Sequence, residues 1–180
     1  LQTLYIGIQP SDYEAIDERP HSQVIGFMSR LNEDLGLGVL IDAFILLKKE
    51  QGFTDLRLKV TGGYTGDDKK FVNKQIRKIR KAGFEEDFEI VEDLSDESRN
   101  AFLRSISVLS VPVLKGEAFG LYLLEALATG VPVVQPALGG FPEIIELTKG
   151  GVTYTPNTPM ALAESLGKVL SDENVLAQFG

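Results

Sequence analysis

Short apolar runs alternate along this chain with longer stretches in which apolar residues recur at helical spacing. The short runs are rich in Val, Ile and Leu, which is typical of strands buried on both faces. They predict strands at Gln23–Met28, Leu56–Thr61, Phe88–Val91, Ser107–Val111, Val131–Gln135 and Val152–Tyr154. The longer stretches predict helices at Gly36–Gln51, Asp67–Ala82, Asp96–Ser105, Leu121–Thr129, Pro142–Glu146 and Pro159–Leu170.

This alternation predicts an α/β fold, with a parallel sheet and helices on both of its faces. Right-handed crossovers make such a sheet Rossmann-like. We expect a single domain over residues 23–180, preceded by an irregular lead-in over residues 1–22. Local signals agree, because Ser95 is a good helix cap and Gly83 and Gly130 are good helix ends. Ligands of this fold bind beyond the carboxyl ends of the strands, so the loops that follow the strands are where a site is expected.

Composition removes several classes of function. The 180 residues carry a net charge of −8, which disfavours a nucleic-acid partner. Cysteine is absent and histidine occurs once, so neither disulfides nor thiolate or His-rich metal sites are expected. No apolar run approaches the ~20 residues of a membrane span. The basic cluster Lys74, Arg77, Lys78, Arg80 and Lys81 is best interpreted as one solvated helix face.

The most informative segment runs from Gly116 to Val134, where the chain leaves a strand, turns through two glycines and enters a helix. Backbone N–H groups and the helix dipole at such a turn favour an anion, and a diphosphate suits that place. Glu117 lies in the predicted turn, and Glu125 lies in the helix among apolar residues, where a carboxylate needs water or a partner. The alternative is an ordinary polar stripe, formed by Glu125 with Tyr122 and Thr129.

Glu117 and Glu125 are separated by seven residues and match the E-x7-E motif, so the segment resembles the retaining family-4 glycosyltransferases, or glycosyl transferases group 1. A lone pair of acids would be weak evidence, but many neighbouring positions are in register. They are Phe119-Gly120, Glu125-Ala126-Leu127-Ala128, Gly130, Pro132-Val133-Val134, Gly139-Gly140 and Pro142-Glu143. Outside this segment the resemblance extends to Gly26–Leu31, Asp42-Ala43-Phe44 and Val60–Gly63, and Gly7-Ile8 resembles the end of the family's interdomain linker. The family fold, GT-B, has two Rossmann-like domains, and this chain resembles the C-terminal, donor-binding one.

The resemblance implies a role for each matching residue. Glu125 would accept hydrogen bonds from ribose hydroxyls, and Glu117 would contact the donor sugar and face the anomeric carbon. Arg30 would pair with the diphosphate and stabilise the leaving group, so that Glu117 and Arg30 are the catalytic candidates. The other donor-binding candidates are Phe119, Gly120 and Leu121 through backbone N–H groups, Gly62 and Gly63 through close backbone approach, and Leu94 beside the base.

The resemblance implies no cofactor and no metal, because cations and helix N-termini replace the metal in this fold. The donor would be a nucleoside-diphosphate sugar, and the acceptor would bind in an N-terminal domain that this chain lacks. Since the chain starts without Met, we expect it to be a piece of a longer protein. The resemblance further implies a cytoplasmic protein, and any contact with the membrane surface would come through the missing half.

Some residues depart from the family pattern. Leu35 stands where a phosphate-binding lysine is usual, Glu92 where a glycine is common and Val113 where a serine is usual. Lys115 lies near the acidic turn and could partly replace the missing charge.

Three functions therefore remain open. The first is the donor half of a retaining glycosyltransferase, inactive in isolation. The second, motivated by Leu35, is a non-catalytic nucleotide-binding or interaction relic. The third is half of a sugar-nucleotide 2-epimerase, which the single histidine, His21, argues against.

Overall fold

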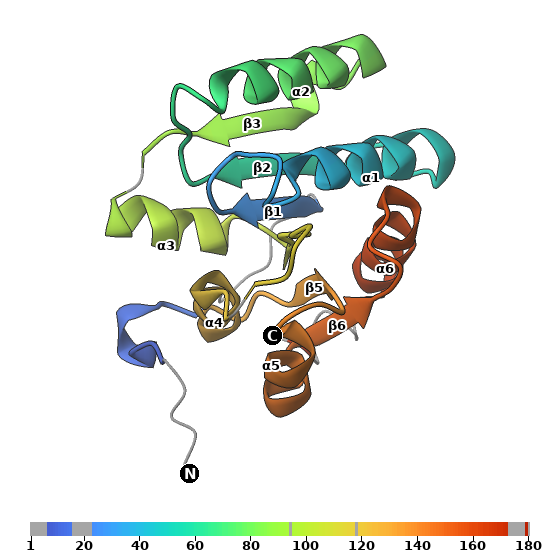
Figure 1. Ribbon diagram of the computed structural model, residues 1–180. Helices are drawn as coiled ribbons and strands as arrows, with labels where there is room; N and C mark the ends of the chain where they lie inside the picture. The colour runs from blue at the N-terminus through green and yellow to red at the C-terminus, as the bar shows by residue number, and fades with distance from the viewer. Residues whose placement is uncertain (1–6, 16–22, 94, 118, 173–178, 180) are drawn as a thin grey trace.

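A computed structural model of the chain describes residues 7–15, 23–93, 95–117, 119–172 and 179. Six parallel strands form one sheet in the order β3-β2-β1-β4-β5-β6, which is the Rossmann strand order. The α/β, Rossmann-like fold expected from the alternation is thus confirmed. The strands are β1 Val24–Met28, β2 Arg57–Thr61, β3 Phe88–Val91, β4 Val108–Leu109, β5 Val133–Pro136 and β6 Gly151–Tyr154 (Figure 1).

The helices lie close to the predicted ranges. They are α1 Leu37–Glu50, α2 Lys69–Ala82, α3 Asp96–Arg104, α4 Leu121–Ala128, α5 Phe141–Thr148 and α6 Pro159–Ser171, with single 3-10 turns at Pro10–Asp12 and Glu85–Asp87. The caps predicted from the sequence are present, since Ser98 N donates to Ser95 Oγ and Gly83 ends α2 at φ 87°. Pro142 occupies the second rather than the first helical position, because α5 begins at Phe141.

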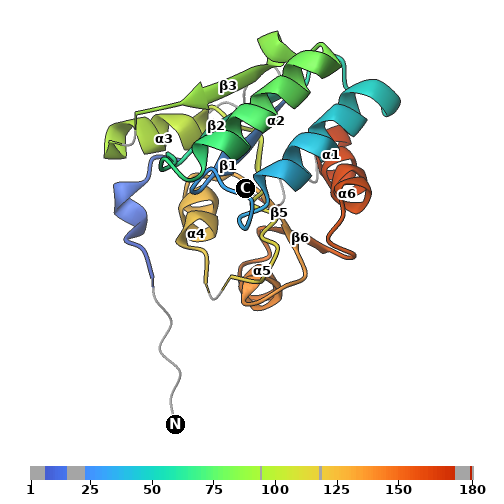
Figure 2. The ribbon, with the colours of Figure 1, turned by 45° about the horizontal axis from the view of Figure 1, so that its top comes forward.

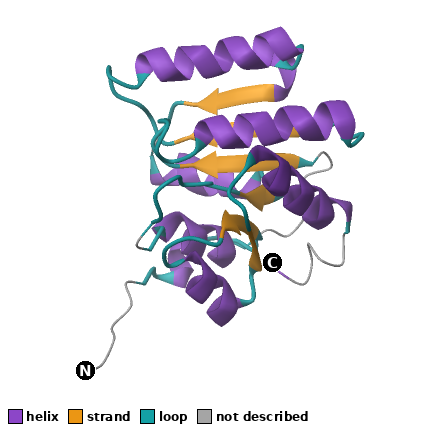
Figure 3. Cartoon of the chain, turned by 45° about the vertical axis from the view of Figure 1, so that its right-hand side comes forward, coloured by secondary structure: helices purple, strands orange, loops and turns teal. Residues whose placement is uncertain are grey.

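Right-handed crossovers place α1 and α2 on one face of the sheet, and α3, α4 and α5 on the other. After β6 the chain returns across the first face, where α6 packs on α1 (Figures 2 and 3). The core between these layers is apolar, and its largest fully buried side chains include Phe27, Phe44 and Phe141. No helix in the described part of the chain is both long and apolar enough to span a bilayer.

The strand predicted at Ser107–Val111 is shorter in the structure, where β4 covers two residues. Beyond β4 the backbone hydrogen bonding between strands is interrupted, because Val111 N donates to the side-chain Oε1 of Gln135 instead of to a strand carbonyl. Pro112 follows and has no N–H to continue the ladder. The chain therefore leaves the sheet early, and it does so at the point where the strand order reverses.

That reversal lies between β1 and β4, from which the crossovers run in opposite directions. The loops that follow these two strands are in contact, since Leu114 N donates to Asp34 O over 2.8 Å. Gly36 permits this contact, because a Cβ there would lie 1.9 Å from Pro112 O. In a doubly wound sheet the carboxyl-end crevice beside such a reversal is the expected ligand position.

Candidate functional site

A hollow of about 290 Å³ lies at this reversal point. It is lined by the last residue of β1, by residues that follow β1 and β2, and by residues of α3 and α4: Met28, Ser29, Arg30, Gly62, Arg99, Leu121, Tyr122 and Glu125. The lining thus brings together Arg30, Gly62, Leu121 and Glu125, which the sequence predicted for one site. Arg99 is a second arginine in the lining that the sequence did not suggest.

Glu125 is buried on α4, with only 7% of its surface exposed. Its carboxylate accepts two hydrogen bonds from Arg99 Nη2, at 2.5 Å to Oε1 and 2.7 Å to Oε2. The hydroxyl of Tyr13 donates to Oε1 over 3.2 Å. Burial and the negative charge of Glu125 raise the pKa of Tyr13, so this hydroxyl stays protonated and able to donate. The partner that a buried carboxylate requires is therefore supplied by another helix and by the lead-in segment.

Arg30 stands at the mouth of the hollow, with half of its side chain exposed. Its Nε donates to Asp68 Oδ2 over 2.8 Å, and its Nη2 donates to Thr65 Oγ1 over 2.9 Å. The hydrogen bond from Arg30 is the first cause of a lowered pKa at Asp68, so that carboxyl stays charged at neutral pH. These two partners hold the guanidinium in place while leaving its other N–H groups for a ligand.

Gly62 and Gly63 form the turn after β2, and both have positive φ values of 125° and 69°. A Cβ at Gly62 would lie 2.1 Å from Ser29 O, so the loops after β1 and β2 can approach each other only if residue 62 is glycine. Gly63 O in turn accepts a hydrogen bond from Leu31 N over 2.8 Å. The close contact between these two loops therefore explains the glycine turn without a ligand, and Gly62 also lines the hollow.

The N-terminus of α4 opens toward the same hollow. Gly120 precedes the helix in a left-handed conformation at φ 74° and has no side chain with which to cap it. Leu121 is exposed and lines the hollow, while Phe119 is half-buried in the preceding turn. The first N–H groups of a helix have no partner within it, so this end can bind an anion or a polar oxygen.

Glu117 lies beside the hollow and is not part of its lining. Its backbone is fixed by the loop after β5, because Gly140 N donates to Glu117 O over 3.0 Å and a Cβ at Gly139 would lie 2.1 Å from that oxygen. Tyr122 lines the hollow, and its pKa is raised first by burial and then by the negative charge of Glu117. Glu117 is therefore close enough to this lining residue to act on it electrostatically. Glu125 itself lines this hollow, and Glu117 lies close to Tyr122, another of its lining residues.

Three further residues singled out from the sequence are Leu35, Lys115 and Leu94. Leu35 is half-buried against the core and does not line the hollow. Lys115 Nζ pairs with Asp34 Oδ1 over 3.0 Å at the surface. Leu94 lies outside the described residues, so its predicted place beside the base stays a prediction.

Sequence reasoning missed Arg99 and Tyr13. A signal for Arg99 was present, because Ser95 marks the start of a helix at the carboxyl edge and Arg99 falls in the first turns of that helix. Tyr13 carries no comparable signal, since the contact joins residues 112 positions apart through an irregular segment.

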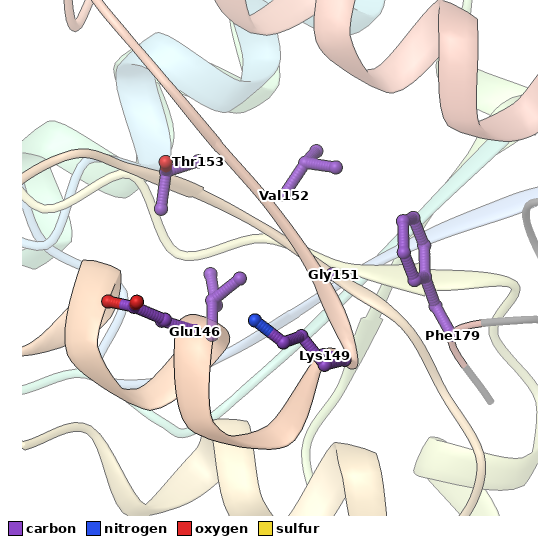
Figure 4. A pocket seen from close by; sticks show the side chains of 7 residues that line it. Glu146, Lys149, Gly151, Val152, Thr153 and Phe179 are labelled. Carbon is purple, nitrogen blue, oxygen red and sulfur yellow. The ribbon is translucent and has the colours of Figure 1, made fainter.

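A second, larger hollow of about 460 Å³ lies along the edge strand β6 and the end of α5. Figure 4 shows that its charged lining residues are Glu146 and Lys149, next to Val152, Thr153 and Phe179. It lies away from the reversal of strand order and lacks a buried charged group, so the smaller hollow is the better candidate site. No cluster of acidic residues and histidine suited to a metal ion occurs among the described residues.

Comparison with known proteins bears on this site. A family model described as glycosyl transferases group 1 matches residues 9–180. The chain is 29% identical over 153 residues to a D-inositol 3-phosphate glycosyltransferase of Corynebacterium urealyticum, covering 85% of this chain and 36% of that protein. The chain therefore spans about a third of the length of such a curated relative.

Solved structures give the same fold. The C-terminal domain of a glycosyl transferase group 1 family protein from Francisella tularensis superimposes with a TM-score of 0.84 at 24% identity, over 96% of this chain and 92% of that one. Anabaena HepE, solved in complex with UDP and glucose, superimposes with a TM-score of 0.85 at 21% identity, over 99% of this chain and 49% of that one. At these identities the likeness establishes the fold, and that fold is the one expected from the sequence.

Proposed function

The chain belongs to the glycosyl transferases group 1 family, and we propose that it binds the sugar donor in the reaction of a longer enzyme. The donor is a nucleoside-diphosphate sugar. The enzyme transfers the sugar to an acceptor hydroxyl with retention of configuration at the anomeric carbon. The acceptor binds in a preceding domain, so the isolated chain binds donor without transferring sugar.

The observation that carries this proposal is the hollow in which Glu125, Arg30, Gly62 and the start of α4 meet. A buried carboxylate at one side suits ribose hydroxyls, and a half-exposed arginine suits a diphosphate. The open N-terminus of α4 adds donors for phosphate or sugar oxygens. The complex of Anabaena HepE with UDP and glucose supports the same ligand class on a similar fold.

Arg30 stabilises the charge that develops on the diphosphate as it leaves, because its guanidinium already sits at the mouth of the hollow. Glu117 and the adjoining turn, with the backbone of Phe119 and Gly120, face the donor sugar. With the cation and the helix amides in these roles, we expect transfer to need no metal.

The test is a calorimetric titration of this chain with UDP, GDP and ADP. The chain binds at least one of them, and Glu125→Gln weakens that binding by about tenfold to a hundredfold, since hydrogen bonds to a charged acceptor are worth ~1.5–3 kcal/mol. Glu164→Gln is the matched control, because Glu164 is an exposed carboxylate on α6, outside the lining of the hollow. Absence of binding by all three nucleotides at millimolar concentration would overturn the proposal.

The second candidate function is a non-catalytic relic that holds a nucleotide or a protein partner. It is favoured by Leu35, an aliphatic side chain where the resembling family has a phosphate-binding lysine. An acceptor-dependent assay of the full-length protein distinguishes the two, because a relic binds nucleotide without forming a glycosidic product.

A further inference from the structure

We propose that Arg99 is a positioning residue for nucleotide binding, which holds Glu125 in the orientation that accepts a ribose hydroxyl. This inference rests on the proposed function, because it concerns the carboxylate that would bind the ribose. Arg99 lies on α3, whereas the two acids of the E-x7-E motif lie in the turn before α4 and on α4 itself.

The position of Arg99 is fixed by the start of α3. Ser95 caps the helix by accepting from Ser98 N, and Arg99 N donates to Ser95 O over 2.9 Å as the helix begins. The side chain then crosses to α4, where a single nitrogen, Nη2, contacts both carboxylate oxygens of Glu125. Both side chains line the hollow, so this pair forms part of its wall.

The number of acceptor positions on Glu125 limits what a ligand can do there. A carboxylate offers about four lone-pair positions. The two hydrogen bonds from Arg99 and the one from Tyr13 fill three of them, two on Oε1 and one on Oε2. The position left on Oε2 is where a ribose hydroxyl can donate without displacing either partner.

Removing Arg99 would change that acceptor in two ways. The Glu125 side chain has only 10% of its surface exposed, and a buried carboxylate that has lost its cationic partner is unfavourable. The carboxylate would also lose the two-point contact with Arg99 and rotate about its last torsion, which is broad for glutamate. A well-oriented charged acceptor therefore depends on the Arg99 side chain.

The guanidinium has five N–H donors, and both bonds to Glu125 start from one nitrogen. Arg99 could therefore act in a different way, by contacting phosphate directly. It could also oppose binding, if ribose had to displace it from Glu125. A direct phosphate contact would act whether or not the ligand carries ribose hydroxyls. A competitor of ribose would make the natural nucleotide bind more tightly when Arg99 is removed, which is the opposite of positioning.

The experiment pairs variants with two ligands. Wild type, Arg99→Gln and Arg99→Lys are titrated with whichever of UDP, GDP and ADP binds most tightly, and with its 2′,3′-dideoxy form. We expect Arg99→Gln to weaken binding of the natural nucleotide about tenfold. Binding of the dideoxy form should change less than twofold, because it has no hydroxyl for Glu125. Arg99→Lys, which keeps the charge, should recover part of the loss.

Arg104→Gln is the matched control. Arg104 lies on the same helix, has similar exposure and pairs with Glu14 of the lead-in, but it is absent from the lining of the hollow. It should leave binding of both ligands unchanged. Thermal unfolding of each variant shows whether it is folded. If Arg99→Gln does not fold, the binding of both ligands by Arg99→Lys is compared with wild type instead.

Three outcomes would overturn the inference. Equal losses for both ligands would assign Arg99 to phosphate or to general structure. Tighter binding of the natural nucleotide by Arg99→Gln would make Arg99 a competitor of ribose. Unchanged binding would remove any role in the site. If wild type binds none of the nucleotides, the proposed function fails instead, and that result is distinct from all three.

Discussion

Gly62 is the position at which a single added methyl group should disturb both the fold and the candidate site. It has φ 125°, and a Cβ built on it would lie 2.1 Å from Ser29 O and 2.4 Å from Ser29 C. Both contacts are to backbone, so no flexible side chain can move away to relieve them. Gly62→Ala must therefore separate the loops that follow β1 and β2.

The magnitude follows from three contributions. A non-glycine residue at positive φ costs ~1–2 kcal/mol. Separating the loops endangers the hydrogen bonds from Ser29 N to Thr61 O and from Leu31 N to Gly63 O, each worth ~0.5–1.5 kcal/mol net. Since backbone relaxation relieves part of the overlap, we expect Gly62→Ala to lower the free energy of unfolding by about 2–5 kcal/mol.

Urea denaturation measures this loss, and Gly66→Ala is the matched control in the same loop. A Cβ at Gly66 would meet nothing within 4 Å, and its φ is not positive, so alanine there should leave stability unchanged or raise it slightly. Stabilities of Gly62→Ala and Gly66→Ala within ~0.5 kcal/mol of each other, a typical surface-mutation effect, would refute the steric argument. If Gly62→Ala remains folded, it should also bind nucleotide more weakly, because Gly62 lines the hollow.

Two further predictions concern Lys48 and Leu35. The buried ammonium of Lys48 donates to Thr54 O, Leu56 O and Asp87 Oδ2. Lys48→Met removes these three hydrogen bonds and should lower the free energy of unfolding by about 2–4 kcal/mol. A loss under ~1 kcal/mol in urea denaturation would contradict this. Leu35→Lys should raise nucleotide affinity about tenfold if the hollow holds a diphosphate. Leu35→Met is its uncharged control, and titrations in which both variants match wild type would favour the non-catalytic relic.

Secondary structure was predictable where local interactions decide it. The cap at Ser95 and the left-handed end at Gly83 involve neighbouring residues only, and both are found where the sequence places them. The short strand β4 was not predictable, because its length depends on where Gln135 reaches across from β5 to take the N–H of Val111. An apolar run in a sequence indicates burial and leaves open which buried residues continue the ladder.

The same difference between local and long-range interactions applies to the candidate site. The sequence required a partner for a carboxylate in an apolar helix, but the identity of that partner depends on how α3 packs beside α4. Arg99 lies 26 positions from Glu125, and Tyr13 lies 112 positions away. Gly62 illustrates the reverse case, because sequence reasoning explained it by a ligand and the structure explains it first by Ser29 O. A residue can lie in the site that the sequence predicts and still be required mainly for packing.

The net charge of −8 would suggest that this chain repels an anionic ligand, yet two arginines and one glutamate line the candidate site. With Asp68, which pairs with Arg30 over 2.8 Å, their formal charges sum to +2 − 2 = 0, and the N-terminus of α4 adds a partial positive charge. Charges beyond ~8 Å are largely screened at physiological ionic strength, so the distant acids contribute little there. Arg99 is needed for this local balance, because without it the same groups would sum to +1 − 2 = −1. Its pairing with Glu125 thus lets one hollow combine an acceptor for hydroxyls with arginine N–H groups that can bind phosphate.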